Sequence, residues 1–136
     1  MRPSRSKRLV VREICLLAVL VGGTACGDID LVCPGALFED NLRVEVVDGE
    51  TGAPVAEGAT GHARSETLQV RLEPGPENAN GVIEELRATV LVGTYEVTVA
   101  KSGYRTWVRE GVVVEAKNAC MYPAHVILTA ALVPAP

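Results

Sequence analysis

The stretch GTYEVTVAKSGYRTW, Gly93 to Trp107, decides the fold class. Its first half alternates between apolar and polar side chains, as one strand of a half-buried sheet does. The apolar residues on the shared face are Tyr95, Val97 and Val99. The segment KSGY, Lys101 to Tyr104, then forms a turn in which Gly103 can take a positive φ. Residues 94–100 are therefore expected to form a strand.

The same alternation recurs on both sides of this stretch. The other alternating segments are residues 42–48, 67–73, 85–92, 112–116 and 125–133. Turn-forming clusters separate them, most densely at Asp48 to Pro54 and at Pro74 to Gly81. About seven short strands in roughly 90 residues predict an all-β fold, a single β-sandwich. A helix-containing α+β fold is the alternative, with GVIEELRATV as the nearest approach to a helical pattern.

Two sequence patterns in these segments are shared with a known family. One is G-T-Y-x-V-x-V-x-x-x-G-Y, from Gly93 to Tyr104, and the other is D-x-x-T-G-x-P-V, from Asp48 to Val55. They resemble the carboxypeptidase regulatory-like domains, which are transthyretin-like β-sandwiches. The resemblance implies a sandwich domain over residues 42–133 followed by a tail, 134–136, although residues 62–86 match poorly. It also implies a non-catalytic module of an exported protein.

The first 25 residues have the organisation of an export signal. A region with five Lys and Arg precedes an apolar run from Ile14 to Val21, and small residues follow from Gly22 to Ala25. The apolar run is shorter than the roughly 20 residues that a transmembrane helix needs. The sequence therefore predicts a signal peptide over residues 1–25 that is cleaved, and a tether over residues 26–41.

The residues around Cys26 indicate the fate of that cysteine after cleavage. Gly23-Thr24-Ala25-Cys26 resembles the lipobox of bacterial lipoproteins, in which the cysteine receives a diacylglyceryl group and becomes the first mature residue. The resemblance implies a cell-envelope protein that is held on a membrane by lipid at Cys26. Gly27 is not the aspartate that marks inner-membrane retention, which favours the outer membrane. Gly23 and Ala25 also suit ordinary signal peptidase, so a periplasmic or secreted form is the alternative.

The cysteine count supports lipidation and predicts a disulfide. Cys15 leaves with the signal peptide, and three cysteines are an awkward number for an exported protein. If Cys26 carries lipid, Cys33 and Cys120 remain as one pair. A bridge between them would close a loop of about 90 residues and stabilise the domain substantially. Two buried free thiols are the alternative.

Charge and residue inventory narrow the function. After cleavage the chain keeps 16 acids and 8 Lys and Arg, a net charge of −8, which repels phosphates and makes nucleic acid an unexpected partner. His62 and His125 stand alone without metal-ligand spacing, so no metal or other cofactor is expected. A catalytic nucleophile, base and orienting group cannot be assembled from the sequence, and no enzyme activity is expected.

The function that these observations predict is that of a non-enzymatic envelope lipoprotein with an interaction or structural module. Its partner is expected to be an envelope protein or a glycan. A carbohydrate- or small-ligand-binding module is the alternative, and Trp107 is its one candidate contact residue, since it is the only tryptophan. Trp107 can equally belong to the core.

Overall fold

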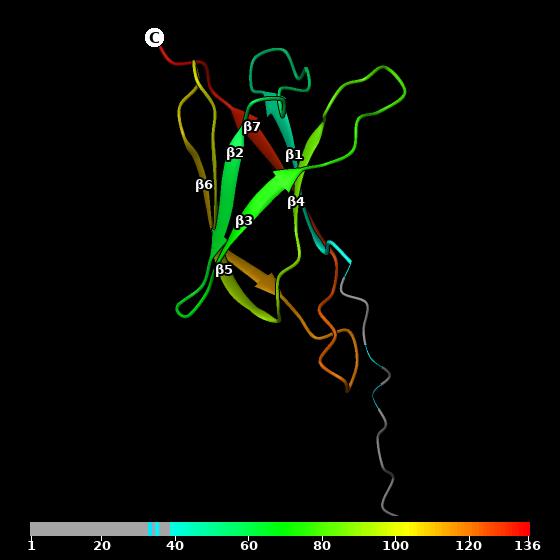
Figure 1. The fold of residues 1–136 in the computed structure, drawn as a ribbon. Helices are drawn as coiled ribbons and strands as arrows, with labels where there is room; N and C mark the ends of the chain where they lie inside the picture. Colours follow the sequence, from blue (N-terminus) through cyan, green and yellow to red (C-terminus); the bar gives the residue numbers. More distant parts are fainter. Residues whose placement is uncertain (1–32, 34, 36–38) are drawn as a thin grey trace, which may run out of the picture. The chain divides into compact units, whose positions relative to one another are not determined.

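The computed structural model describes Cys33, Gly35 and residues 39–136 (Figure 1). This part of the chain contains seven strands and no helix. The strands are β1 (Leu42–Asp48), β2 (Thr60–Arg64), β3 (Gln69–Pro74), β4 (Glu85–Ala88), β5 (Gly93–Ala100), β6 (Trp107–Val114) and β7 (Val126–Leu132). None of the described residues belongs to a helix that could cross a membrane. The predicted all-β fold is confirmed.

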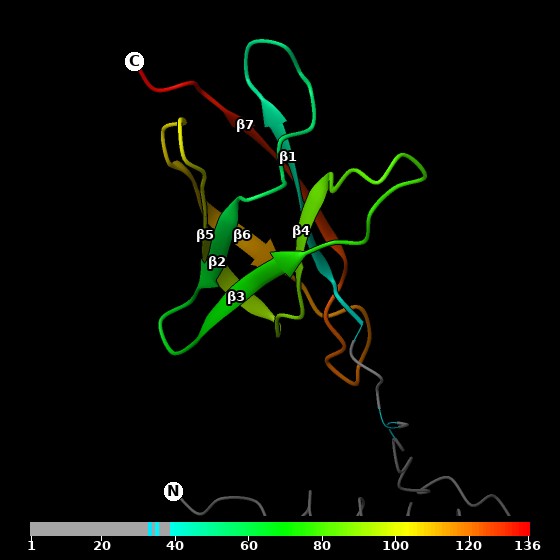
Figure 2. The same cartoon turned by 45° about the horizontal axis from the view of Figure 1, so that its top comes forward.

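The strands form one mixed sheet with the order β6-β5-β2-β3-β4-β1-β7. All neighbours are antiparallel except β1 and β7, which are parallel. β3 belongs to both halves of the sheet, because Gln69 to Leu72 pair with β2 and the last two residues, Glu73 and Pro74, pair with β4. The sheet bends there, and its two halves face each other across the core as in a sandwich (Figure 2).

The two edge strands, β6 and β7, are held together at both ends. At one end a bridge between Ala116 and Pro123 closes the hairpin that joins them. At the other end the Arg105 N–H donates to the Val133 carbonyl oxygen at 2.8 Å. The Ala135 N–H adds a further backbone hydrogen bond beside it. The sheet is therefore nearly closed, and the last residues of the chain take part in closing it.

The core contains the alternate residues of β1 and β5 that the sequence predicts to be buried, whereas Leu68 of the predicted segment 67–73 is 39% exposed. In β1, Leu42, Val44 and Val46 are fully buried, and the strand covers the predicted residues 42–48. Tyr95 in β5 is buried as well, and its hydroxyl donates to the Leu91 carbonyl at 3.0 Å. Burial of whole apolar side chains is the main favourable term in such a domain.

Two predicted strands differ by several residues from their bounds in the structure, whereas the segments 67–73, 94–100 and 125–133 differ by one or two residues at their ends. The strand expected over residues 85–92 ends at Ala88, because the next residues turn toward the start of β1. The strand expected over residues 112–116 begins earlier, at Trp107. A bulge in β6, with Gly111 at φ 67°, shifts its register against β5 and breaks the alternation that would have marked residues 107–111.

β2 was not among the predicted strands, because its inward residues are small. Gly61 and Ala63 are buried between the polar residues of the segment TGHAR, so the alternation carries almost no hydrophobic signal. β2 nevertheless pairs with both β3 and β5. Only glycine fits at position 61, since an added Cβ would lie 2.7 Å from Leu72 Cδ1 and 2.9 Å from the Thr98 carbonyl oxygen.

We expect Gly61→Ala to lower the free energy of unfolding by about 1–3 kcal/mol, as overpacking of a dense core does. Urea denaturation of the two proteins measures the difference. Gly35→Ala is the matched control, since nothing lies within 4 Å of a Cβ at that position. Equal stabilities of Gly61→Ala and the natural protein would contradict the close packing of β2.

Candidate functional site

The loops of the domain gather at two opposite poles (Figure 1). The N-terminal pole comprises the segment before β1, the β2–β3 turn (65–68), the β4–β5 loop (89–92) and the β6–β7 hairpin (115–125). The far pole comprises the β1–β2 loop (49–59), the β3–β4 loop (75–84), the β5–β6 turn (101–106) and the C-terminus. Any partner that binds loops meets one of these two surfaces.

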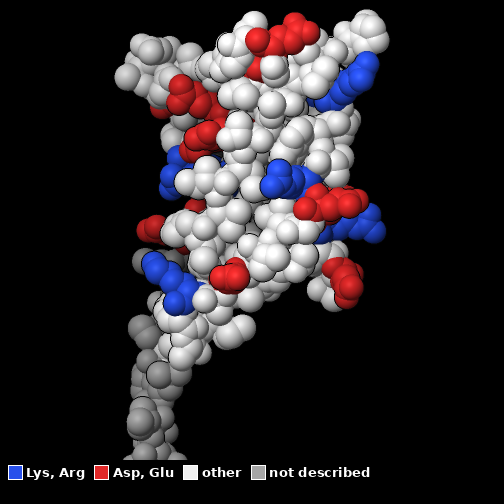
Figure 3. Space-filling view, turned by 180° about the vertical axis from the view of Figure 1, so that it is seen from behind, with Lys and Arg blue, Asp and Glu red and all other residues white. Residues whose placement is uncertain are grey.

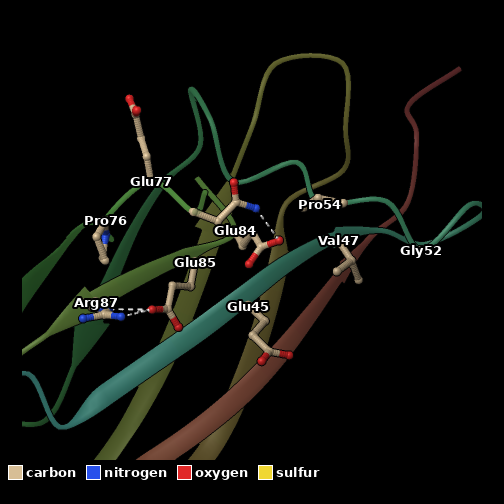
Figure 4. A pocket seen from close by; sticks show the side chains of 10 residues that line it. Glu45, Val47, Gly52, Pro54, Pro76, Glu77, Glu84, Glu85 and Arg87 are labelled. Atoms are coloured by element: carbon tan, nitrogen blue, oxygen red, sulfur yellow. Dashed lines mark hydrogen bonds and ion pairs between the residues drawn. The ribbon is translucent and has the colours of Figure 1, made fainter. Parts of the chain in front are cut away.

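An acidic groove opens beside the far pole, between the β1–β2 and β3–β4 loops (Figure 4). Its volume is about 490 Å³. It is lined by Glu45, Val47, Gly52, Pro54, Pro76, Glu77, Asn78, Glu84, Glu85 and Arg87. These residues come from β1, β4 and the two loops, which are far apart in the sequence. Sequence reasoning missed the groove for that reason.

Asn78 orders the wall that the β3–β4 loop provides. Its side-chain oxygen accepts hydrogen bonds from the backbone N–H groups of Asn80 (2.8 Å) and Val82 (3.1 Å). Its Nδ2 donates to Glu84 Oε1 at 2.9 Å. Gly81 completes the turn at φ 73°. The sequence signal for this loop is Asn-x-Asn-Gly, a typical turn-forming arrangement.

The groove is lined by more carboxylates than cationic side chains. Arg87 pairs with Glu85 through its Nε, at 2.6 Å from Oε1, and through Nη2. The other three carboxylates, on Glu45, Glu77 and Glu84, remain without a cation in the groove. The face seen in Figure 3 shows acids and bases scattered among uncharged residues. A ligand with a positive charge or with several hydrogen-bond donors suits the groove best.

The opposite wall is braced by Asp48, at the end of β1. Asp48 Oδ1 accepts hydrogen bonds from the N–H groups of Glu50 (2.8 Å) and Thr51 (2.9 Å). Asp48 Oδ2 accepts a hydrogen bond from the Tyr104 hydroxyl at 2.8 Å. Asp48 and Tyr104 belong to the two sequence patterns at 48–55 and 93–104, and their contact ties the β1–β2 loop to the β5–β6 turn.

These hydrogen bonds shift the pKa values of Asp48 and Tyr104. The Thr51 N–H, with the Tyr104 hydroxyl and the Glu50 N–H, lowers the pKa of Asp48 below its ordinary 3.8. The bond to Asp48 raises the pKa of Tyr104 above its ordinary 10.0. The Asp48 contribution to stability is therefore present above pH 3.8 and is lost as the pH falls through its lowered pKa. The Tyr104 contribution is present below pH 10.0 and is lost as the pH rises through its raised pKa.

We expect Asp48→Asn to lower the Tm by about 5 °C at pH 7. The difference from the natural protein should shrink as the pH falls toward 2, because Asp48 in the natural protein is then protonated and uncharged, as the asparagine side chain is at every pH. Thermal unfolding of both proteins from pH 2 to 7 measures this. Glu66→Gln, which removes an exposed carboxylate of the β2–β3 turn, is the control. A Tm difference that stays constant over this range would contradict the expected role of the charge.

The residues predicted for the site lie in separate places. Cys33 and Cys120 form a disulfide with a Cα–Cα distance of 5.6 Å, which confirms the predicted pair. Cys26 lies outside the described residues. Trp107 is half-buried, packs against the core and does not line the acidic groove. Its position favours the core interpretation over a ligand platform.

The histidines do not come together with the acidic residues. His62 lies in β2, and His125 lies in the hairpin at the N-terminal pole, and neither lines the groove. Across the described part of the chain no three His, Cys, Asp or Glu side chains are placed to hold a metal ion.

Asn41 is the structural residue that sequence reasoning missed, since it was assigned to the tether. It is buried, its Oδ1 accepts the Val90 N–H at 2.8 Å, and its Nδ2 donates to the Ala124 carbonyl at 3.2 Å. Its own carbonyl accepts the Val126 N–H at 2.7 Å. An asparagine before a strand gives no sequence signal for such a role, because its partners are 49 and 83 residues away.

Comparison with protein-family models and with curated proteins finds no match for this chain. The similarity to carboxypeptidase regulatory-like domains therefore stays a prediction.

Proposed function

We propose that this protein is a non-enzymatic lipoprotein of the bacterial cell envelope, with lipid at Cys26 as its membrane anchor. The sandwich domain then acts as an interaction module, and its partner is an envelope protein or a glycan.

The observation that carries the proposal is the Cys33–Cys120 disulfide. Disulfides persist in exported proteins and are rare in the reducing cytosol. The bridge uses two of the three cysteines that would remain after signal cleavage, and it leaves Cys26 for another modification. Export and a modified Cys26 together account for every cysteine of the chain.

The arrangement of the two poles supports a role in which the anchored domain exposes its acidic groove to a partner. The chain enters the domain at the N-terminal pole, beside the β6–β7 hairpin to which Cys33 is bonded. The acidic groove lies toward the far pole. An anchored domain could thus contact a partner through its groove. A partner with basic side chains or with hydrogen-bond donors complements the charge there.

Intact mass spectrometry of the protein extracted from membranes tests the anchor. We expect a chain that begins at Cys26 and carries the added mass of acyl groups. We expect the Cys26→Ser protein to lack this added mass and to be absent from the membrane fraction. An unmodified chain that begins at Met1 would overturn the proposal. A chain cut near residue 26 without acyl mass would identify the periplasmic or secreted alternative.

Cross-linking in intact envelopes tests the groove as the contact surface. The variant Glu45→Gln/Glu77→Gln removes two groove charges, and Glu66→Gln/Glu110→Gln removes two exposed charges elsewhere as the matched control. We expect the cross-linked partner to be lost from the first variant only. Equal cross-linking by both variants would place the contact outside the groove.

A further inference from the structure

Exposed apolar side chains occur on every inter-strand loop of the N-terminal pole. Each of its three inter-strand loops carries one: Leu68 in the β2–β3 turn (39% exposed), Leu91 in the β4–β5 loop (55%) and Met121 in the β6–β7 hairpin (61%). The other large apolar side chains exposed in the described part of the chain are Val108 and Val113 in β6, Ile127 in β7, and Val133, which follows β7 in the C-terminal segment of the far pole. None lies in the three loops of the far pole. Single exposed apolar residues are ordinary, but one on every loop of a single pole needs an explanation.

Met121 is held outward at the tip of its hairpin. It is the one described non-glycine residue with a positive φ, 58°. The turn around it is tied by Asn118, whose carbonyl accepts the Met121 N–H at 3.0 Å and whose Oδ1 accepts the Cys120 N–H at 3.0 Å. The hairpin is further fixed by the disulfide at Cys120. Met121 therefore presents a flexible apolar side chain on a backbone that hydrogen bonds and the disulfide hold in place.

The proposed anchor would bring this pole close to lipid. Cys33 is bonded to the same hairpin, and the seven residue steps from Cys26 to Cys33 reach at most about 25 Å. The pole that carries the three apolar loops is thus the pole next to the anchored end of the chain. A protein surface kept this near a bilayer meets it at a high effective concentration, so even weak apolar contacts can form.

We propose that the N-terminal pole docks on the surface of a phospholipid bilayer, with Leu68, Leu91 and Met121 in the headgroup region. This proposal rests on the proposed lipid anchor at Cys26. Docking orients the domain with its acidic groove directed away from the membrane. Three contact points on separate loops fix a plane, whereas the acyl anchor alone leaves the domain free to tumble.

Quenching by brominated lipid tests the contact. The full-length mature protein is extracted in detergent and reconstituted into phosphatidylcholine vesicles with or without brominated acyl chains. Met121→Trp places the probe on the proposed surface, and Glu77→Trp places it at the far pole as the control. Trp107 contributes the same background to both variants. After subtraction of the Trp107 emission of the natural protein, we expect brominated lipid to reduce the added emission of Met121→Trp about twofold, as for a side chain at the headgroup boundary, and to leave that of Glu77→Trp nearly unchanged.

Second-site substitutions test whether the three loops act together. Leu68→Ser/Leu91→Ser in the Met121→Trp protein should weaken the quenching. Val108→Ser, which removes an apolar side chain of similar exposure (50%) at the far-pole end of β6, should not. Unchanged quenching in the Leu68→Ser/Leu91→Ser protein would overturn the three-point contact.

Flotation of the same vesicles separates the two proposals. Protein that floats while Met121→Trp is unquenched overturns docking and leaves the anchor intact. Protein that does not float overturns the proposed lipid anchor and, with it, the proposed docking. Flotation together with selective quenching of Met121→Trp supports both.

Discussion

The double variant Cys33→Ser/Cys120→Ser is expected to lose about 4–5 kcal/mol of unfolding free energy, with a Tm lower by about 20 °C. The reason is the loop that the disulfide closes, which has a sequence separation of 87 residues. Cross-linking so long a segment removes much of the conformational entropy of the unfolded chain. Since a domain of this size has a total stability of about 5–15 kcal/mol, the variant should be close to the limit of folding at 37 °C.

Chemical denaturation of the double variant and of the natural protein, with and without reductant, measures this effect. Reduction of the natural protein should reproduce the stability of the variant, which separates the loss of the covalent link from any effect of serine itself. The far-ultraviolet circular dichroism of the folded variant should be unchanged, because the disulfide constrains the unfolded state more than the folded one. A loss below about 1 kcal/mol would show that the unfolded chain gains little freedom from breaking the bridge.

Asn41→Leu is expected to lower the free energy of unfolding by about 3 kcal/mol, which is the second largest effect. The substitution leaves the Val90 N–H and the Ala124 carbonyl without their partner, and each buried polar group left unpaired costs about 1–3 kcal/mol. Leucine has a similar size and cannot donate or accept. Asn80→Leu, at an exposed asparagine of the β3–β4 loop, is the matched control and should change stability by less than about 0.5 kcal/mol.

Hydrogen exchange gives this prediction a local measurement. The Val90 amide is a buried donor in the natural protein and should exchange slowly, whereas in Asn41→Leu it should exchange faster than the amides of β5. Protection of Val90 that is unchanged in the variant would mean that another acceptor replaces Asn41, and the expected stability loss would then be wrong.

Large alternating side chains made most of the strands predictable. β1 follows its predicted bounds because each inward position holds a leucine or valine. β5 is one residue longer than predicted at its start, and β7 is one residue shorter than predicted at each end. The pattern fails where packing selects small residues or where the alternation itself breaks. Gly61 and Ala63 hide β2, and the bulge at Gly111 hides the first half of β6.

The candidate site was predictable only in part. Cysteine parity led to the Cys33–Cys120 pair without any geometry, because the predicted export signal and the predicted modification of Cys26 left these two cysteines to pair. The acidic groove and the bracing bond between Asp48 and Tyr104 could not be predicted in this way, since their residues are separated by up to 56 positions.

The sequence by itself determined the all-β class, the positions of most strands and the pairing of Cys33 with Cys120. Each of these follows from information within one segment or from a simple count. Only the tertiary structure decided the strand order, the burial of Asn41 and the gathering of the loops at two poles. The physical reason is that alternation reports which face a side chain takes within its own strand, whereas strand order depends on how all the buried faces pack together.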